Sequence, residues 1–293
     1  MPSSSPARRL PRYLKKSLMS FNERRDVYRI MRTKGLSTVC EEARCPNIGE
    51  CFSQKTATFM IMGDRCTRRC HFCSVTTKKP LPLDRDEPHK VARAALDLGL
   101  DYVVITSVDR DELSDHGAAH FVDVVHGVKS LLPQVKVEVL VPDFRGRSEL
   151  IDLVLGSPID VFGHNIESAE RLYKRLRPQS SFSVTKGVLA HAASSKKRVI
   201  KSGMMVGVGE TDEEVLETLD LLYGLGVEIV TIGQYLSPSL KHWPVHRYVS
   251  EESFRKFETY GMALGLKNVF AGPFVRSSYH AKEAHRRIYD QAH

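Results

Sequence analysis

Three cysteines lie close together in the stretch Asp64–Val75, which reads DRCTRRCHFCSV. Cys66, Cys70 and Cys73 have the spacing Cys-x3-Cys-x2-Cys, and a loop this short can turn three thiolates toward one point. A structural zinc site is normally closed by four protein ligands, and a 4Fe–4S cluster is usually held by four cysteine thiolates. Three ligands would leave one metal position open to a small molecule, so we interpret the loop as a metal or cluster site that does chemistry.

The alternative for this loop is a zinc knuckle with His71 as the fourth ligand. Because His71 is adjacent to Cys70 and lies between two ligands, tetrahedral ligation by all four side chains would be awkward. Phe72, just before the last cysteine, would supply the apolar cover that limits water at a cluster.

A second cysteine triad precedes the first. Cys40, Cys45 and Cys51 have the spacing Cys-x4-Cys-x5-Cys, and no cysteine follows Cys73. Six cysteines in a small secreted domain would suggest disulfides, but this chain has 293 residues and shows no signal-peptide pattern. Ligation of metal or clusters in a reducing compartment is therefore the better interpretation.

The composition, 42% hydrophobic and 27% charged, is typical of a globular protein, and no apolar run is long enough to span a membrane. The net charge of +8 comes from residues 1–34, so the rest of the chain is neutral. A neutral body argues against a domain built around nucleic acid. The basic arm either meets an acidic partner, lies solvated or acts as a transit peptide.

Six apolar runs of strand type alternate with helical patterns and predict a parallel sheet. The absence of a GxGxxG fingerprint favours a full or partial barrel over an open doubly wound sheet. In either fold the site lies at the carboxyl ends of the strands, which is where Cys66 follows the first strand. The expected strands cover residues 58–62, 102–107, 135–141, 160–164, 198–206 and 227–232.

We therefore predict an α/β protein with a partial (β/α)6 TIM-type barrel over residues 58–235. Residues 1–57 would form a basic arm and cluster-binding extension, and residues 236–293 a C-terminal extension. We expect the alternation to stop after Gly233, with a Pro-containing loop, a helix over residues 251–264 and a tail of small and polar residues.

The pattern Cys-x3-Cys-x-aromatic-Cys after the first strand of a β/α protein resembles the radical S-adenosylmethionine superfamily. The resemblance implies a 4Fe–4S cluster on Cys66, Cys70 and Cys73, whose open iron binds the amino and carboxylate groups of S-adenosylmethionine. One electron from the cluster would cleave the sulfonium and give a 5′-deoxyadenosyl radical that abstracts an unactivated hydrogen. In such chemistry the protein supplies orientation and the exclusion of solvent.

The upstream triad narrows the resemblance. Its sequence, CEEARCPNIGEC, is similar to the lipoyl synthase family, as are HNIE, SGMMVGVGET, TIGQYLSP and GPFVRSSYHA. The resemblance implies an auxiliary 4Fe–4S cluster on Cys40, Cys45 and Cys51, with Ser278 of the Arg-Ser-Ser-Tyr motif as fourth ligand. Without the cysteines, the two serines would be interpreted as a solvated turn. Because a hydroxyl is a harder and poorer partner for iron than a thiolate, we expect Ser278 to be a labile ligand.

The resemblance also implies the reaction and its partners. Two sulfur atoms would enter at carbons six and eight of an octanoyl chain on a carrier lysine, with two S-adenosylmethionine molecules cleaved and the auxiliary cluster consumed as sulfur source. The implied carriers are 2-oxoacid dehydrogenase E2 subunits and the glycine cleavage H protein. An electron donor such as ferredoxin or flavodoxin and an iron–sulfur carrier for cluster repair complete the set. We expect no nucleic acid or membrane partner, and a cytoplasmic location, or an organellar matrix in a eukaryote.

Other candidate residues follow later strands. Asn165, Glu167 and Glu210 would contact S-adenosylmethionine, with ordinary loop capping as the alternative for each. His164 is interpreted equally well as a hydrogen-bonded structural histidine or a catalytic one, and the charged residues 109–112 as a solvated run.

Two competing functions fit part of the pattern. Another sulfur-inserting radical enzyme, such as a biotin synthase relative, would share the Cys66 triad but has no reason to carry the upstream triad together with Ser278. A zinc-stabilised RNA-binding protein would be colourless and would bind RNA with a steep salt dependence.

Overall fold

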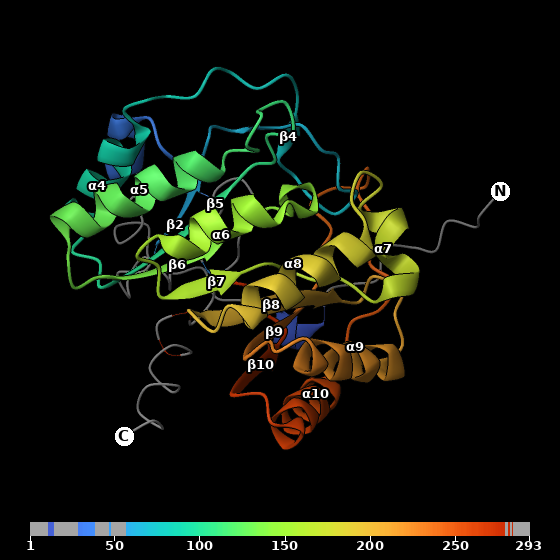
Figure 1. Ribbon diagram of the computed structural model, residues 1–293. Helices are drawn as coiled ribbons and strands as arrows, with labels where there is room; N and C mark the ends of the chain where they lie inside the picture. The colour runs from blue at the N-terminus through green and yellow to red at the C-terminus, as the bar shows by residue number, and fades with distance from the viewer. Residues whose placement is uncertain are drawn as a thin grey trace.

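The protein is described by a computed structural model over residues 11–14, 29–38, 47, 57–278, 281 and 283. Its centre is an eight-stranded sheet in which six strands pair in parallel and in chain order (Figure 1). This confirms the predicted partial barrel of consecutive β-α units. The six strands are β2 (Ala57–Ile61), β5 (Tyr102–Ser107), β6 (Lys136–Leu140), β7 (Val161–Gly163), β8 (Val199–Val206) and β9 (Ile229–Gln234).

Two further strands form the edges of the sheet. β1 (Ser37–Thr38) pairs antiparallel with β2, and β10 (Asn268–Gly272) pairs in parallel with β9. The expectation that the alternation stops after Gly233 was wrong, because β10 continues it for one more unit. β10 is short, and its only residues typical of a strand are Val269 and Phe270, so the strand was hidden within a tail that looked irregular.

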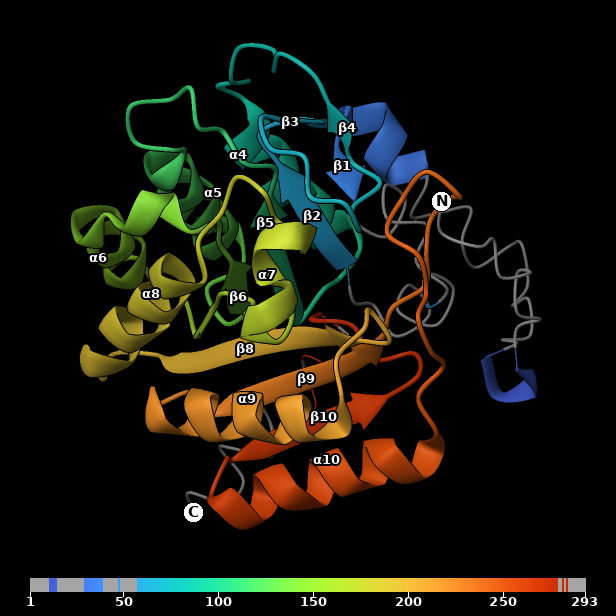
Figure 2. The same cartoon turned by 90° about the vertical axis from the view of Figure 1, so that its right-hand side faces the viewer.

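Helices cover the outer face of the sheet, as Figures 1 and 2 show. Along β5, Val103 and Ile105 join the main apolar core beneath these helices, because side chains alternate between the two faces of a strand. The helices are α4 (Glu87–Asp97), α5 (Ala118–Leu131), α6 (Ser148–Gly156), α7 (Glu170–Leu176), α8 (Phe182–Ser194), α9 (Asp212–Gly224) and α10 (Glu251–Leu264), with the 3-10 turns η1 (Arg12–Leu14) and η2 (Phe144–Gly146).

The inner face of the sheet carries a buried polar group. Lys201 Nζ donates to Glu138 Oε1 at 2.7 Å, and the Tyr102 hydroxyl donates to Glu138 Oε2 at 2.8 Å. Ala281 packs against Tyr102 and Val104 on the same face. A residue beyond the Arg-Ser-Ser-Tyr motif therefore lies against the inside of the barrel. None of the helices described is long and apolar enough to cross a membrane.

Candidate radical and auxiliary cluster sites

The Cys66 loop leaves the barrel directly after β2. Cys66 ends the short strand β3 (Arg65–Cys66), which pairs in parallel with β4 (Thr76–Thr77), so the two strands bracket the remaining cysteines. Within the loop, the Cys73 amide donates to the Cys70 carbonyl at 3.1 Å. Phe72 packs into a satellite apolar cluster with Leu172, Leu176, Val208 and Tyr235, and its role as a cover for a 4Fe–4S cluster stays a prediction.

All three thiols of this loop are free and partly buried. Burial and the Asp109 charge raise the pKa of Cys66 to about 11, and burial and the other two cysteines raise the pKa of Cys73 to about 12. Burial also raises the pKa of Cys70. The thiols of the metal-free chain are therefore protonated at neutral pH, and iron binding must release protons.

The zinc-knuckle alternative gains no support from this loop. The His71 ring stacks on Trp243 with centroids 6.4 Å apart. In the part of the chain that the structure describes, no group of three or more His, Cys, Asp or Glu could hold a single metal ion. A 4Fe–4S cluster needs a different arrangement, because each thiolate binds a different iron.

A buried arginine inside the loop, which the sequence interpretation missed, fastens it to the barrel. Arg68 is 3% exposed, and its backbone amide lies 3.4 Å from Cys66 Sγ. Its guanidinium donates to both oxygens of Asp111, at 2.7 Å each, and to both oxygens of Asp143, at 2.6 and 2.7 Å. Since Asp111 follows β5 and Asp143 follows β6, one side chain ties the loop to two strand ends.

This network corrects the expectation that residues 109–112 are merely solvated. The pKa of Asp143 is lowered, because the stabilising effect of the Arg68 guanidinium on the carboxylate outweighs the opposing effect of burial. The pKa of Asp111 is lowered for the same reason. Arg110 is also buried and donates to the carbonyls of Met62 and Leu81. The sequence did contain a signal for this network: an arginine lies between candidate ligand cysteines, and carboxylates follow the next two strands. Neighbouring parallel strands end at one edge of a sheet, so these side chains could be expected to meet.

Asn165 and Glu167 lie at the carboxyl end of β7, beside the cysteine loop. Glu167 has a φ of 68°, a left-handed conformation that is uncommon for a non-glycine residue and concentrates at functional sites. Its amide donates to the Gly203 carbonyl at 2.9 Å, and its charge adds to the raised pKa of Cys70 and Cys73. A Cβ on Gly203 would lie 3.0 Å from Asn165 Oδ1, so the glycine admits the asparagine.

Arg177 is a second residue that the sequence interpretation missed. It is 7% exposed, and Nη1 donates to the Tyr173 hydroxyl at 2.9 Å. Among the described residues its Nε is buried without a hydrogen-bond partner. The positive charge of Arg177 lowers the pKa of Cys70 and of Glu167, against the dominant effect of burial. An unsatisfied buried donor beside the thiols fits a site that takes a polar ligand.

Glu210 caps its own loop, which was one of its two predicted roles. Its carboxylate accepts from the amides of Gly207, Val208 and Gly209 at 2.7, 2.9 and 3.1 Å, and from Arg247 at 3.2 Å. These contacts occupy both carboxylate oxygens. A direct contact of Glu210 with S-adenosylmethionine stays a prediction.

His164 has the structural role that the sequence left open. Because a carbonyl oxygen can only accept, its Nδ1 carries the hydrogen and donates to the Val141 carbonyl at 2.9 Å. Nε2 lies 3.3 Å from the Thr185 hydroxyl. Burial lowers the pKa of His164 to about 4, so the ring is neutral at physiological pH.

The segment before Ser278 (residues 274–277) lies at the same end of the barrel as the Cys66 loop. Gly233, the penultimate residue of β9, approaches the Val275 carbonyl so closely that a Cβ there would overlap it. The side-chain amide of Asn47 donates to the Phe274 carbonyl at 2.5 Å, and Ser278 itself is partly buried. Cys40, Cys45 and Cys51 lie outside the described residues, but Asn47 stands between the last two of them in sequence.

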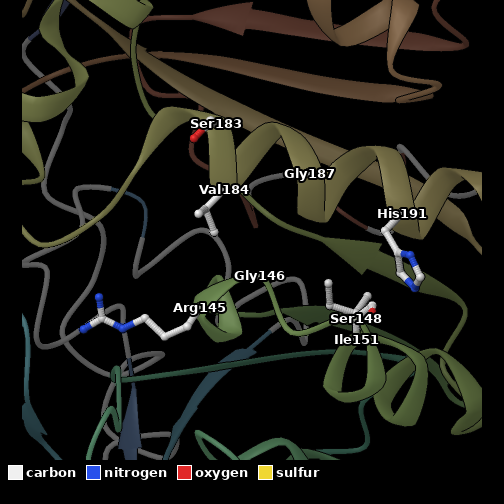
Figure 3. Close-up of a pocket in the computed structure, with 8 residues that line it drawn as sticks. All are labelled: Arg145, Gly146, Ser148, Ile151, Ser183, Val184, Gly187 and His191. Carbon is white, nitrogen blue, oxygen red and sulfur yellow. The ribbon is translucent and has the colours of Figure 1, made fainter.

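A surface cavity of about 400 Å³ lies apart from these residues, in the outer helical layer (Figure 3). It opens between η2, α6 and α8, and none of its lining residues belongs to either cysteine triad. The lining residues are Arg145, Gly146, Ser148, Ile151, Ser183, Val184, Gly187 and His191.

The fold and the three-cysteine loop together define a class of protein. Residues 60–222 match the family model of the radical SAM superfamily, and the chain belongs to it. Among solved structures, methylornithine synthase superposes with a TM-score of 0.56 at 15% identity, covering 94% of this chain and 90% of that one. The FeFe-hydrogenase maturase HydG gives a TM-score of 0.58 at 14% identity over 85% of this chain and 62% of that one. These likenesses show the fold.

Curated relatives narrow the class to one family. The lipoyl synthase of Verminephrobacter eiseniae is 52% identical over 258 residues, which are 87% of this chain and 78% of the relative. That of Chloroflexus aurantiacus is 47% identical over 274 residues, 93% of this chain and 90% of the relative. Within the radical SAM superfamily, the chain belongs to the lipoyl synthase family. It is a sulfurtransferase that uses S-adenosylmethionine and two 4Fe–4S clusters to place sulfur at carbons six and eight of a protein-bound octanoyl chain.

Proposed function

We propose that Cys66, Cys70 and Cys73 hold the cluster that binds S-adenosylmethionine, and that Ser278 closes the auxiliary cluster. The other ligands of the auxiliary cluster would be Cys40, Cys45 and Cys51. One observation carries this assignment: the Asn47 side chain is hydrogen-bonded to the Phe274 carbonyl, four residues before Ser278. This bond joins a residue of the upstream cysteine segment to the residues just before the C-terminal motif, at the end of the barrel where the Cys66 loop also lies, and it supports the proposal.

The remaining residues of this end would bind and orient S-adenosylmethionine. Asn165 offers an amide, Glu167 a carboxylate and Arg177 an unsatisfied buried donor beside the thiols. Glu210 would shape the glycine-rich turn that approaches the ligand, and its own ligand contact remains part of the proposal. When bound, the cluster and S-adenosylmethionine supply the radical that abstracts hydrogen from the octanoyl chain.

Ser278 would serve as a ligand that can be released. Its hydroxyl is harder than a thiolate and binds iron less well, so it favours opening of one iron as sulfide moves to the substrate. The segment that carries it is held in part by the Asn47 bond to the Phe274 carbonyl. A weak ligand suits a cluster that is consumed.

The protein acts on lipoyl-carrier proteins, and we propose the E2 subunits of 2-oxoacid dehydrogenases and the glycine cleavage H protein as those carriers. Ferredoxin or flavodoxin would donate electrons, and an iron–sulfur carrier would rebuild the auxiliary cluster. A reducing compartment suits unpaired thiols, so we propose the cytoplasm or, in a eukaryote, an organellar matrix. We also propose that the chain is divided into three regions, residues 1–57, 58–235 and 236–293. β1 attaches the first region to the sheet, and β10 attaches the last.

The test is an iron assay combined with mass spectrometry. Protein purified without oxygen should be brown and hold about eight irons per chain, four in each cluster. An octanoylated carrier peptide incubated with S-adenosylmethionine and a reductant should gain two sulfur atoms. Ser278→Ala should retain the Cys66-loop cluster and cleave S-adenosylmethionine but form little lipoyl product. An iron-loaded protein that leaves the peptide mass unchanged would contradict the proposal.

A further inference from the structure

The outer side of the Cys70–Cys73 turn reaches the protein surface between two other segments. The His71 amide donates to the Leu176 carbonyl at the end of α7, and the His71 carbonyl accepts from the Trp243 amide, each at 2.8 Å. The Arg175 guanidinium lies 5.1 Å from the Trp243 ring centroid, and the exposed His71 ring stacks on the same indole. α7, the cysteine turn and the segment after β9 therefore form one continuous surface, with α7 in front of the sheet in Figure 2.

This surface carries positive charge that no ion pair among the described residues neutralises. Arg69, Lys174, Arg175 and Lys241 are exposed, and none of them forms an ion pair with another described residue. By contrast, Arg171 on the same helix pairs with Glu214 at 2.7 Å. We name the basic face as Arg69, His71, Lys174, Arg175, Lys241 and Trp243.

The basic face also lies close to the cluster that we propose on the Cys66 loop. Only His71 and Phe72 separate Cys70 from Cys73 in the chain, and His71 is exposed. On the barrel side the loop is covered by the Arg68 network, in which Arg68 is 3% exposed. Because electron transfer slows steeply with distance, a donor protein gains most by docking where the cluster turn meets the surface.

We propose that the basic face docks an acidic one-electron carrier protein, whose flavin or iron–sulfur centre then lies next to the Cys70–Cys73 turn. This rests on the proposed function, which places the reducible cluster on that turn. In the encounter the carrier is oxidised by one electron and the cluster is reduced by one, with no bond made or broken. Charge complementarity raises the association rate, and electron-transfer interfaces are small and short-lived, which suits a face of about six residues.

The test compares a protein donor with a small one. The variant Lys174→Glu/Lys241→Glu reverses two charges and leaves Arg175 on the Trp243 ring. The control Lys197→Glu/Lys256→Glu makes the same charge change elsewhere: Lys197 precedes β8, at the amino ends of the strands, and Lys256 lies on α10. Each reconstituted protein is mixed anaerobically with reduced flavodoxin, or with photoreduced 5-deazariboflavin as an uncharged donor, and cluster reduction is followed by stopped-flow absorbance.

At low ionic strength, the face variant should be reduced by flavodoxin about tenfold or more slowly than the control, because steering contributes factors of this size. The difference should shrink at 0.5 M salt, where the charges are screened. Reduction by deazariboflavin and the EPR signal of the reduced cluster should match those of the control. Equal flavodoxin rates in both variants would overturn the proposal.

Two other outcomes would also overturn the proposed docking of the electron donor, and the measurements distinguish one from the other. If the face variant is reduced normally but loses turnover of the octanoylated carrier under deazariboflavin, the face docks the carrier protein instead of the electron donor. Failure of the proposed function looks different, because the unmodified protein would then lack iron on the Cys66 loop and would not cleave S-adenosylmethionine with either donor.

Discussion

The Cys66 loop and the segment before Ser278 are attached to the same end of the barrel by different forces. Arg68 holds the loop through four charged hydrogen bonds to Asp111 and Asp143, inside a buried network. Two contacts of the segment before Ser278 are neutral by comparison: the Asn47 bond to the Phe274 carbonyl and the close approach of the Val275 carbonyl to Gly233. Removing one partner of a buried ion pair costs far more than removing one neutral hydrogen bond.

This difference matches what each cluster must do. The cluster that we propose on the Cys66 loop would be used again in every turnover, so its ligands would gain from a rigid support. The auxiliary cluster would give up its sulfur, so its proposed fourth ligand, Ser278, would have to leave and return. The comparison predicts that mutations in the two regions have effects of different size and kind.

The largest effect is expected at Arg68. Arg68→Met would leave the buried Asp143 without its counter-charge and Asp111 with only the surface pair to Arg145, and we expect a loss of about 3–5 kcal/mol in the free energy of unfolding. Anaerobic denaturation followed by Trp243 fluorescence measures this loss. Arg145→Met is the matched control, because Arg145 also binds Asp111 but from the surface, where an ion pair contributes about 1 kcal/mol or less. Equal stability of the two variants would contradict the proposed support.

Lowering the pH should reduce the free energy of unfolding through His164, which follows β7 at the carboxyl ends of the strands. Its pKa is lowered to about 4 in the folded chain, against about 6.5 in an unfolded one. Between these values the unfolded chain binds a proton that the folded chain does not, so stability falls as pH drops through this window and levels off below about 4. The contribution is about 3 kcal/mol. Denaturation midpoints between pH 7 and 4.5 should change less steeply in His164→Gln, and an unchanged slope would refute this origin.

Gly233→Ala tests the attachment of the Ser278 segment. The new methyl group would overlap the Val275 carbonyl, and overpacking of this kind costs about 1–3 kcal/mol unless the segment moves. We expect the segment to move, so that iron falls from about eight to about four per chain while S-adenosylmethionine cleavage persists. Gly224→Ala is the control, because nothing lies within 4 Å of a Cβ there. Loss of both clusters together would argue against separate supports.

The smallest effect is expected at Asn47. Asn47→Ala removes the hydrogen bond to the Phe274 carbonyl, and one neutral bond contributes about 1 kcal/mol. Global stability should change little, while the auxiliary cluster should be lost faster to a chelator, as followed by absorbance. An auxiliary cluster that decays at the unmodified rate would show that this bond does not hold the segment.

The sequence alone predicted the features that depend on residue patterns. Six strands and the place of the Cys66 loop followed from apolar periodicity, and the family followed from both triads and the Arg-Ser-Ser-Tyr motif. β10 was missed because NVFAG has only two residues typical of a strand, Val269 and Phe270, and its strand conformation depends on pairing with β9. Tertiary context overrides local preference in such short strands.

The support of the site was harder to predict. Arg68, Asp143 and Arg177 are far apart in sequence, and their roles depend on which side chains meet after folding. Glu210 illustrates the same limit, because the sequence could not tell a loop cap from a ligand contact, whereas three short amide bonds to its carboxylate reveal the cap.

The central claim is that Ser278 is a ligand whose release permits sulfur transfer. Its most direct test is a single turnover of Ser278→Cys with an octanoylated carrier peptide, in which 5′-deoxyadenosine and lipoyl product are quantified together by mass spectrometry. A thiolate would hold the auxiliary iron more firmly than the hydroxyl. The account predicts full loading of both clusters and normal deoxyadenosine formation, with lipoyl product reduced about tenfold or more. Lipoyl product equal to that of the unmodified protein would contradict it.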